Sequence, residues 1–364
     1  MQISKLHKRN HCKPIWKATK YLHDTQICSS RLNFHRKVFG FEKSGDICII
    51  VHGGCGQCRN SVICEKLNGC KKAASLGYKK MMVGENALSA VETALRWLEC
   101  DEWFNCGYGS VLNQLGEGQM DASIMDGEKL EIGSVGAVSD IEHPISLAKF
   151  ILKNYPNTVI VGEGTKNLSR CMHVPWVSKG NMVSPKATLA LNLTSDSNPH
   201  LKYNVEDLES ADLLKRSWGT TGCVAWDGHS IAAGTTTGGL SGKTVGRIGD
   251  SSFLGCGTFA NNLAGCCLTG HGETIMKCGL ARKVVTDIVE GCCPEDALKQ
   301  NIDSMQRQTD QECGGIVLQN NGCWGVYFTT PRMPYAVVNK DWITYGADPC
   351  SKKIQKSFDL DLDL

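Results

Sequence analysis

The sequence predicts a mixed α/β fold whose second half is rich in strands. Three observations support this fold class. A short apolar run at residues 47–51 is typical of a buried strand, apolar residues recur with a helical period across 85–99, and strand-like segments crowd the chain after residue 220. The chain has 364 residues, of which 41% are apolar and 21% charged. It is a globular composition with enough length for two ordinary domains or one large one.

In the first half, the apolar run at 47–51 ends at His52-Gly53-Gly54. The helix predicted over 85–99 follows. Residues 135–138 form a second strand candidate, and Pro144 fits the first turn of a helix that comes next. A third strand is expected at 159–161.

A polar segment separates the halves. Between about 177 and 217, Ser, Asn, Asp, Lys and Pro dominate, and the helical and strand patterns stop. This composition predicts a long exposed linker. A structureless run of this length is uncommon inside a compact protein and is usually functional or disordered.

The second half begins with two strand candidates, 221–225 and 231–235, joined by a turn at 226–229. A helix is expected over 273–290. Two further strands, 315–318 and 324–328, flank Asn320-Asn321-Gly322, which is a strong hairpin signal. The acidic tail at 359–364 is expected to fray.

Charge is distributed unevenly, although the net charge is only +2. Residues 1–40 carry nine Lys and Arg against Asp24 alone, so the remainder of the chain is net negative. We expect residues 1–46 to be a basic, poorly ordered extension. The near-neutral total argues against a nucleic-acid partner, and no apolar run is long enough for a bilayer. We expect a cytoplasmic protein, with a mitochondrial transit peptide as the alternative reading of the basic segment.

Twenty cysteines are an unusual number for a chain of this length. Many stand inside apolar runs, which favours reduced, buried thiols over a disulfide framework. The examples are Cys48, Cys223 and Cys323. Four other cysteines lie close together in the sequence: Cys55, Cys58, Cys64 and Cys70. The spacing of Cys55 and Cys58 could begin a zinc site, which is a weaker alternative because a second close CxxC pair is absent.

The chemistry is suggested by Gly219-Thr220-Thr221-Gly222, where the linker meets the first strand of the second half. A threonine hydroxyl is a weak nucleophile that needs an adjacent base. If the bond between Gly219 and Thr220 were cut, Thr220 would carry a free α-amine, whose reference pKa is about 7.7–8.0. That amine could serve as the base near neutral pH.

Downstream residues complete a pocket for an α-amino acid. Arg247 can hold a carboxylate with two hydrogen bonds, and Asp250 can pair with an ammonium group. Thr269 and Gly270, next to an expected helix start, can donate to a developing oxyanion. Taken singly, each of these motifs is equally compatible with an ordinary turn or a surface salt bridge.

Taken together, these motifs resemble the plant-type asparaginase / isoaspartyl peptidase family of N-terminal nucleophile hydrolases. The resemblance covers about residues 47–348. It includes His52-Gly53-Gly54-Cys55-Gly56, the runs FNCGYGSV at 104–111 and MDASIMDG at 120–127, and then the Thr- and Gly-rich motifs in the family's order. It implies a four-layer αββα sandwich, self-cleavage between Gly219 and Thr220, and an (αβ)₂ dimer.

The family's functional residues match positions of this chain one by one. Thr220 matches the nucleophile, and Thr237 the threonine that contacts substrate and orients it. Arg247 and Asp250 match the clamp on the substrate's α-carboxylate and α-amine. Thr269 and Gly270 match the oxyanion hole. Gly272 matches a backbone contact of the pocket, and Asn105 matches an asparagine near the nucleophile.

The resemblance also implies an α subunit over 47–219, which includes the linker, and a β subunit over 220–364, within one αββα domain. Asparagine and isoaspartyl dipeptides would be the substrates, with no cofactor required. In members of the family a loop binds Na⁺ or K⁺ through backbone carbonyls. Its counterpart here would use Leu98, Glu99, Phe104, Cys106 and Tyr108.

Four positions depart from the family pattern. Cys55 replaces the alanine of HGGAG, and Ser252 replaces the proline after GRVGDS. Thr221 replaces the usual valine after the nucleophile, and Trp218 lies on the leaving side of the scissile bond, where it could slow cleavage. Two alternatives therefore stay open. One is an aspartylglucosaminidase-like hydrolase, although that group usually has TSTNG where this chain has Thr237-Gly238-Gly239. The other is a pseudoenzyme that keeps the fold without cleaving.

Overall fold

The computed structural model describes residues 46–171, 177–194 and 217–356. These belong to one compact unit, Lys43–Leu364. The basic extension and the acidic tail predicted from the sequence lie outside the described residues. Among the described helices, none has the length and apolarity needed to cross a membrane.

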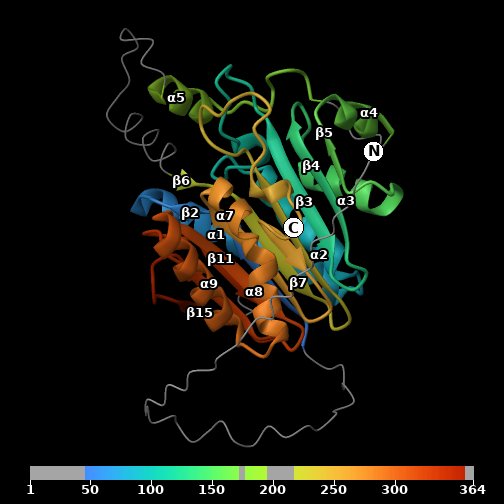
Figure 1. Cartoon of the computed structure of the whole chain (residues 1–364), viewed down its shortest axis with the longest axis vertical. Coiled ribbons are helices and arrows are strands. Elements are labelled where there is room, and N and C mark those ends of the chain that lie inside the picture. The colour runs from blue at the N-terminus through green and yellow to red at the C-terminus, as the bar shows by residue number, and fades with distance from the viewer. Residues whose placement is uncertain (1–45, 172–176, 195–216, 357–364) are drawn as a thin grey trace, which may run out of the picture. The chain divides into compact units, whose positions relative to one another are not determined.

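The larger of the two main sheets has nine strands in the order β15-β14-β13-β1-β7-β8-β3-β4-β5 (Figure 1). Neighbouring strands are antiparallel except β4 and β5, which run parallel. The strands are β1 (Cys48–His52), β3 (Met120–Asp126), β4 (Glu131–Val138), β5 (Val159–Val161), β7 (Thr221–Trp226), β8 (Ile231–Thr237), β13 (Tyr335–Val338), β14 (Trp342–Gly346) and β15 (Lys353–Lys356).

The smaller sheet is antiparallel, in the order β12-β11-β10-β9. Its strands are β9 (Thr258–Ala260), β10 (Ala264–Gly270), β11 (Cys313–Gln319) and β12 (Trp324–Phe328). Two short strands, β2 (Cys55–Gly56) and β6 (Ser217–Trp218), form a separate antiparallel pair. That pair lies next to the predicted cleavage site.

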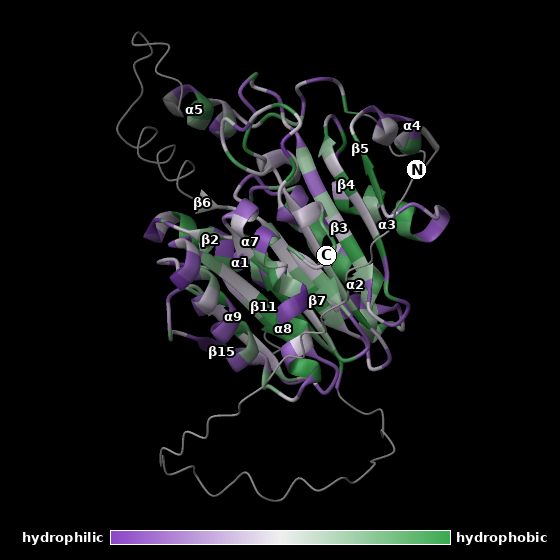
Figure 2. Cartoon of the chain, viewed as in Figure 1, coloured by the Kyte–Doolittle hydropathy of each residue, from purple (hydrophilic) through white to green (hydrophobic). Residues whose placement is uncertain are grey.

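Helices cover the outer face of each sheet (Figure 1). In the first half the helices are α1 (Asn60–Met82), α2 (Ala87–Glu99), α3 (Pro144–Asn154), α4 (Glu163–Cys171) and α5 (Pro185–Thr194). In the second half they are α7 (Gly272–Cys278), α8 (Leu280–Val289) and α9 (Pro294–Thr309). Figure 2 shows hydrophobic residues along the strands and hydrophilic ones on the outer helices and loops.

Three hydrophobic cores hold four layers together. The first lies between α1, α2, α3 and the nine-stranded sheet, the second between the two sheets, and the third between the four-stranded sheet and α7 to α9. Strand β1 illustrates the alternation that this requires. Ile49 and Val51 pack into the first core, whereas Cys48 and Ile50 pack into the second. The fold is therefore the predicted αββα sandwich.

Most elements predicted from patterning are confirmed, namely β1, α2, β4, α3, β5, β7, β8 and the β11–β12 hairpin. Helix α2 begins after Asn86, whose side chain accepts a hydrogen bond from the Ser89 N–H at 3.0 Å. Helix α3 has Pro144 at its first position, as expected.

Two predictions about regular structure were wrong. The single helix expected over 273–290 is two helices, because Gly279 adopts the left-handed conformation (φ 56°) and ends α7 before α8 begins. The linker contains helix α5, since Pro185 opens a run rich in Ala and Leu and the Ser184 hydroxyl accepts from the Ala187 N–H at 3.2 Å. Residues 195–216 lie outside the described part of the chain.

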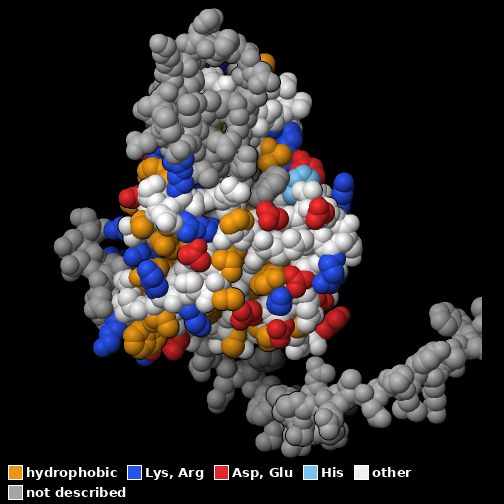
Figure 3. Space-filling model, turned by 90° about the vertical axis from the view of Figure 1, so that its left-hand side faces the viewer, with side chains coloured by type: hydrophobic (Ala, Val, Ile, Leu, Met, Phe, Trp, Pro, Cys, Tyr) orange, Lys and Arg blue, Asp and Glu red, His pale blue; other side chains and the backbone are white. Residues whose placement is uncertain are grey.

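The cysteines whose side chains the structure describes are free thiols. Cys48 and Cys223 are buried as predicted, and burial raises the pKa of Cys48 to about 12. Cys323 was expected to be buried but is exposed, because it follows the hairpin turn at Asn321-Gly322. On the face shown in Figure 3, Lys and Arg side chains are interspersed with Asp and Glu.

Candidate functional site

Thr220 lies directly before β7, in the gap between β6 and β7. The segment from His52 to Gly56 runs beside both flanks of this gap, because β1 pairs with β7 and β2 pairs with β6. Gly54 is so close that a side-chain carbon on it would lie 2.8 Å from the carbonyl carbon of Gly219. A side-chain carbon on Gly219 would collide with Asn105. The backbone at the predicted cleavage bond is therefore tightly enclosed.

The hydroxyl of Thr220 donates a hydrogen bond to Thr237 Oγ1 at 3.3 Å. Antiparallel pairing of β7 with β8 places Thr221 opposite Thr236, which brings the next residues, Thr220 and Thr237, together. Both threonines are buried. Thr237 Oγ1 also accepts from the Gly239 N–H at 3.0 Å, which fixes its position. The two predicted threonines thus meet, although they are 17 residues apart in the chain.

Asn105 ties its loop to the turn after β8. Its carbonyl accepts from the Gly238 N–H at 2.9 Å, and its Nδ2 donates to the Gly239 carbonyl at 2.8 Å. Its Oδ1 accepts from the Val111 N–H at 2.9 Å. The side chain lies against Gly219. Both amide atoms are used within the protein, so Asn105 holds together the loop and the turn that surround Thr220.

Arg247 and Asp250 converge on Gly272. A side-chain carbon on Gly272 would lie 2.8 Å from Asp250 Oδ1 and 2.9 Å from Arg247 Nη2. Burial raises the pKa of Asp250 to about 7, and the Arg247 charge only partly offsets this. Asp250 Oδ2 is buried and has no hydrogen-bond partner in the described chain. A cation and a buried carboxyl group therefore lie beside the same backbone position, Gly272.

Glu273 forms an ion pair with the guanidinium group of Arg247. Its Oε1 accepts from Nε at 2.9 Å and from Nη2 at 2.8 Å. Burial opposes ionisation of Glu273, but the Arg247 charge and the hydrogen bonds to the carboxylate together outweigh burial and lower the pKa of this carboxyl. Sequence reasoning missed this partner, although Glu273 directly follows Gly272. A substrate carboxylate would have to share or displace the Glu273 contact.

Thr269 and Gly270 end strand β10, and helix α7 begins only at Gly272. They belong to the strand rather than to the helix start expected from the sequence. Thr269 is buried and accepts from the Cys55 N–H through Oγ1 at 3.4 Å. The Cys55 thiol donates to the Thr269 carbonyl at 3.4 Å. These bonds place Thr269 beside the segment that flanks Gly219.

Comparison with known proteins decides the family. The sequence model of the family described as asparaginase matches residues 45–346. The chain belongs to the asparaginase family, and it is a hydrolase of the N-terminal nucleophile type.

Three curated relatives named isoaspartyl peptidase/L-asparaginase show how similar the chains are. The Mus musculus protein is 38% identical over 312 residues, which cover 84% of this chain and 92% of the relative. The Homo sapiens protein is 36% identical over 304 residues, 83% and 96% of the two chains. The Xenopus laevis protein is 35% identical over 302 residues, 82% and 94%.

Two histidines stand in the motifs of this asparaginase-family chain. His52 is fully buried, and burial lowers its pKa to about 3, so its ring is neutral at physiological pH. His271 shares a hydrogen bond of 2.6 Å with Thr274 Oγ1 at the start of α7. His52 is therefore unsuited to take a proton from the nucleophile.

Two acidic residues behind the site have side-chain contacts that the sequence analysis did not predict. Asp121 accepts from the Gly249 N–H at 3.0 Å and so holds the segment that carries Arg247 and Asp250. Glu99 is buried and accepts from Thr236 Oγ1 at 2.7 Å. Burial raises the pKa of Glu99 despite its contact with His143. Asp121 lies inside the MDASIMDG motif, which was the one signal for it.

The loop predicted to bind Na⁺ or K⁺ follows α2 and is compact. The carbonyls of Leu98, Phe104 and Cys106 accept backbone hydrogen bonds from Asp101, Cys106 and Gly109 respectively. The Leu98 carbonyl also accepts from the Cys100 N–H. Binding of Na⁺ or K⁺ by this loop stays a prediction.

The four clustered cysteines do not form a metal-binding group within the described chain. Cys55 and Cys70 instead donate to backbone carbonyls of Thr269 and Pro334.

Proposed function

We propose that this protein cuts itself between Gly219 and Thr220 and then hydrolyses the side-chain amide of L-asparagine and the β-linked peptide bond of isoaspartyl dipeptides. The observation that carries the proposal is the contact of Thr220 Oγ1 with Thr237 Oγ1, at a buried bond enclosed by Gly54 and Asn105. The names of the curated relatives support the substrate class.

Self-cleavage begins when Thr220 Oγ attacks the Gly219 carbonyl carbon. The carbon–nitrogen bond breaks, its nitrogen takes the hydroxyl proton, and Gly219 becomes an ester on Oγ. Water then hydrolyses the ester, which leaves the Gly219 carboxylate and restores the hydroxyl. The free α-amine of Thr220 is now available as a base. Thr237 accepts the Thr220 hydrogen bond and so holds Oγ in place.

In the hydrolytic reaction the Thr220 amine takes the hydroxyl proton while Oγ attacks the β-carbonyl carbon of the substrate. Thr269 and Gly270 stabilise the oxyanion that develops. The proton passes to the departing ammonia or amino acid, and an aspartyl ester remains on Oγ. Water releases aspartate and regenerates the hydroxyl.

Arg247, Asp250 and Gly272 recognise the α-amino acid head that both substrates share. The guanidinium binds the α-carboxylate, and Asp250 pairs with the α-ammonium. Gly272 allows both groups to approach the same point, since a side-chain carbon on it would lie 2.8 Å from Asp250 Oδ1 and 2.9 Å from Arg247 Nη2. The leaving group lies outside this contact, which is why one site serves asparagine and isoaspartyl peptides alike.

Gel electrophoresis of the purified protein tests the proposal. Cleavage gives two bands of about 24 and about 16 kDa, in proportion to 219 and 145 residues of a 39.6 kDa chain, and the smaller begins Thr-Thr-Gly-Cys-Val. Thr220→Ala should stay uncut and inactive, because it lacks the nucleophile. Thr221→Val is the matched control and should cleave. A fully active single chain would overturn the proposal.

Other outcomes point to the alternatives. A folded wild-type chain that never cleaves and has no amidohydrolase activity identifies the pseudoenzyme. A cleaved chain that hydrolyses N-glycosyl-asparagine but neither asparagine nor isoaspartyl dipeptides identifies the aspartylglucosaminidase-like enzyme. Trp218 and Thr221 are the residues that raise the first alternative.

We propose an (αβ)₂ dimer, on family resemblance, which sedimentation of the cleaved protein would test.

We also propose that the loop of Leu98 to Tyr108 binds Na⁺ or K⁺ as a structural ion and that no further cofactor is needed. Thermal unfolding in potassium chloride against choline chloride separates the ion from general salt effects. The cytoplasm is the proposed compartment, with the mitochondrion as alternative, and cell fractionation distinguishes them.

A further inference from the structure

Three side chains with metal-binding chemistry meet where the end of α2 approaches the start of α3. Cys100 directly follows α2, and Glu142 with His143 directly precedes α3. One potential ligand atom from each lies within 4.8 Å of the others. None of the three belongs to the catalytic residues proposed above, and the sequence analysis gave no signal for them because 41 residues separate Cys100 from Glu142.

The donor set is a thiolate, an imidazole and a carboxylate. This combination suits a borderline-soft divalent ion such as Zn²⁺, which binds sulfur at about 2.3 Å and nitrogen or carboxylate oxygen at about 2.0 Å. Tetrahedral ligands at those lengths lie roughly 3.5 Å apart. The exposed side chains of Cys100 and Glu142 can close the remaining gap by rotation, while His143 is buried and fixed.

The ring of His143 is held in place by a neighbouring carboxylate. Its Nδ1 lies 3.2 Å from Glu99 Oε2, which leaves Nε2 as the nitrogen for a metal. Glu99 is itself held by the Thr236 hydroxyl at 2.7 Å and the Ile145 N–H at 3.1 Å. A carboxylate behind the ring is the common outer partner of metal-bound histidine, since it fixes the tautomer and raises basicity.

The charge around Cys100 favours a cation. The Glu142 carboxylate belongs to the cluster itself, and the Glu99 carboxylate lies against the His143 ring. A divalent ion at this point neutralises both carboxylates and stabilises the thiolate.

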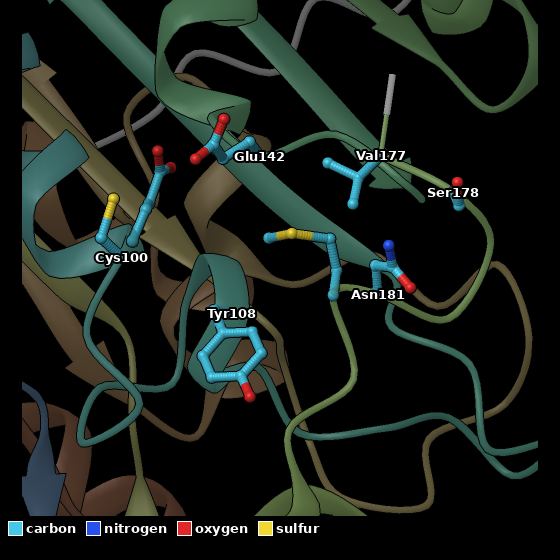
Figure 4. Close-up of a pocket in the computed structure, with 8 residues that line it drawn as sticks. Cys100, Tyr108, Glu142, Val177, Ser178 and Asn181 are labelled. Atoms are coloured by element: carbon cyan, nitrogen blue, oxygen red, sulfur yellow. The ribbon is translucent and has the colours of Figure 1, made fainter. Parts of the chain in front are cut away.

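A pocket of 510 Å³ opens beside the cluster, lined by Glu99, Cys100, Tyr108, Glu142, Val177, Ser178, Asn181 and Met182. Figure 4 shows the Glu142 carboxylate directed toward the side of the pocket on which the Cys100 sulfur lies. Three protein ligands leave the fourth position of a tetrahedral ion open, and here that position can be filled by water from the pocket.

We propose that Cys100, Glu142 and His143 form a binding site for a divalent transition-metal ion of the zinc class, which links the end of α2 to the start of α3. The site is distinct from the carbonyl loop for Na⁺ or K⁺, because its donors are side chains that include sulfur. It does not depend on self-cleavage or on hydrolysis.

Titration with Co²⁺ tests the site directly, because cobalt bound to a thiolate gives a charge-transfer absorption in the near ultraviolet. The wild-type protein should show this band, saturating at one ion per chain and lost on addition of excess Zn²⁺. Cys100→Ser should abolish it. Cys64→Ser removes another exposed thiol, on α1, and should leave the band unchanged.

Further variants separate a built site from adventitious thiol binding. Glu142→Gln and Glu99→Gln should each weaken cobalt about tenfold or more, the latter through His143. Zn²⁺ should raise the melting temperature of the wild type but not of Cys100→Ser, a comparison that uses exposed positions and leaves the fold intact. An unchanged band in Cys100→Ser, or equal cobalt affinity in Glu142→Gln and wild type, would show that these residues do not form a metal site.

Discussion

Asp250 should control the pH dependence of substrate capture. Burial raises the pKa of this carboxyl to about 7, far above its ordinary value of 3.8, and its Oδ2 has no partner in the described chain. Only the ionised carboxyl can pair with the substrate's ammonium. The value of kcat/KM should therefore rise with pH through about 7, and Asp250→Asn, which cannot ionise, should lack this dependence.

The size of the effect follows from the pKa. With a pKa of about 7, about half of Asp250 is ionised at pH 7 and only about 1% at pH 5, so kcat/KM falls about 50-fold between pH 7 and pH 5. Asp250→Asn should lower kcat/KM at pH 8 by roughly 10²- to 10³-fold, since a buried charged partner of the ammonium is lost.

The Thr220 amine produces a rising limb in the same range, between pH 6 and 8, and the two groups must be separated. In the enzyme–substrate complex the bound ammonium lowers the pKa of Asp250, so the limb of kcat reports the amine. The limb of kcat/KM reports both groups. His52 contributes to neither, because burial lowers its pKa to about 3. His52→Asn and His271→Asn complete the set, and loss of the kcat limb in either would make a histidine the base.

Unfolding supplies a readout that is independent of activity. Asp250 has a folded pKa above its unfolded one, so the folded state holds the proton more tightly and stability falls as pH rises through about 7. The difference between 3.8 and about 7 corresponds to roughly 4 kcal/mol. Asp250→Asn should therefore gain stability over the wild type from pH 5 to pH 8. Parallel stability profiles, with a kcat/KM limb intact in the variant, would refute the reasoning.

Three further substitutions test neighbouring contacts. Arg247→Lys keeps the charge but loses the planar fork, so KM for asparagine should rise tenfold or more while self-cleavage continues. Glu273→Gln removes the charge that competes for Arg247 in a partly buried pair, so KM should fall about two- to fivefold at constant kcat. Thr221→Val removes a 3.1 Å hydrogen bond to the Thr236 carbonyl and should cost about 1 kcal/mol in chemical denaturation without loss of cleavage.

The sequence predicted those elements whose large apolar residues follow one clear period. Helix α2 is such a case, with Leu88, Val91 and Leu95 all buried. Helix α1 was missed because small residues make up much of its buried face, among them Gly69, Ala73, Ala74 and Gly77. Strand β3 is buried along its whole length, so its polar residues break the alternation that would have revealed it.

The candidate site was predictable where a residue's own chemistry marks it. The sequence alone reveals a threonine that follows glycine at the end of a linker. It also reveals an arginine three residues before an aspartate. Glu273 and Glu99 act through partners supplied by the fold, at Arg247 and at Thr236 and His143. Their roles depend on contacts between strands and helices that are far apart in the sequence. Local sequence patterns carry no information about such contacts.

The charges around Arg247 and Asp250 explain why this site should bind zwitterionic ligands in preference to ligands with a single charge. Without substrate, the charge of Arg247 is balanced by Glu273, and the raised pKa lets Asp250 remain partly protonated. A ligand with only a carboxylate must compete with Glu273, and one with only an ammonium must first ionise Asp250. A zwitterion does both at once, and each of its charges strengthens the pairing of the other. N-acetylasparagine should therefore bind far more weakly than the loss of one hydrogen bond would give.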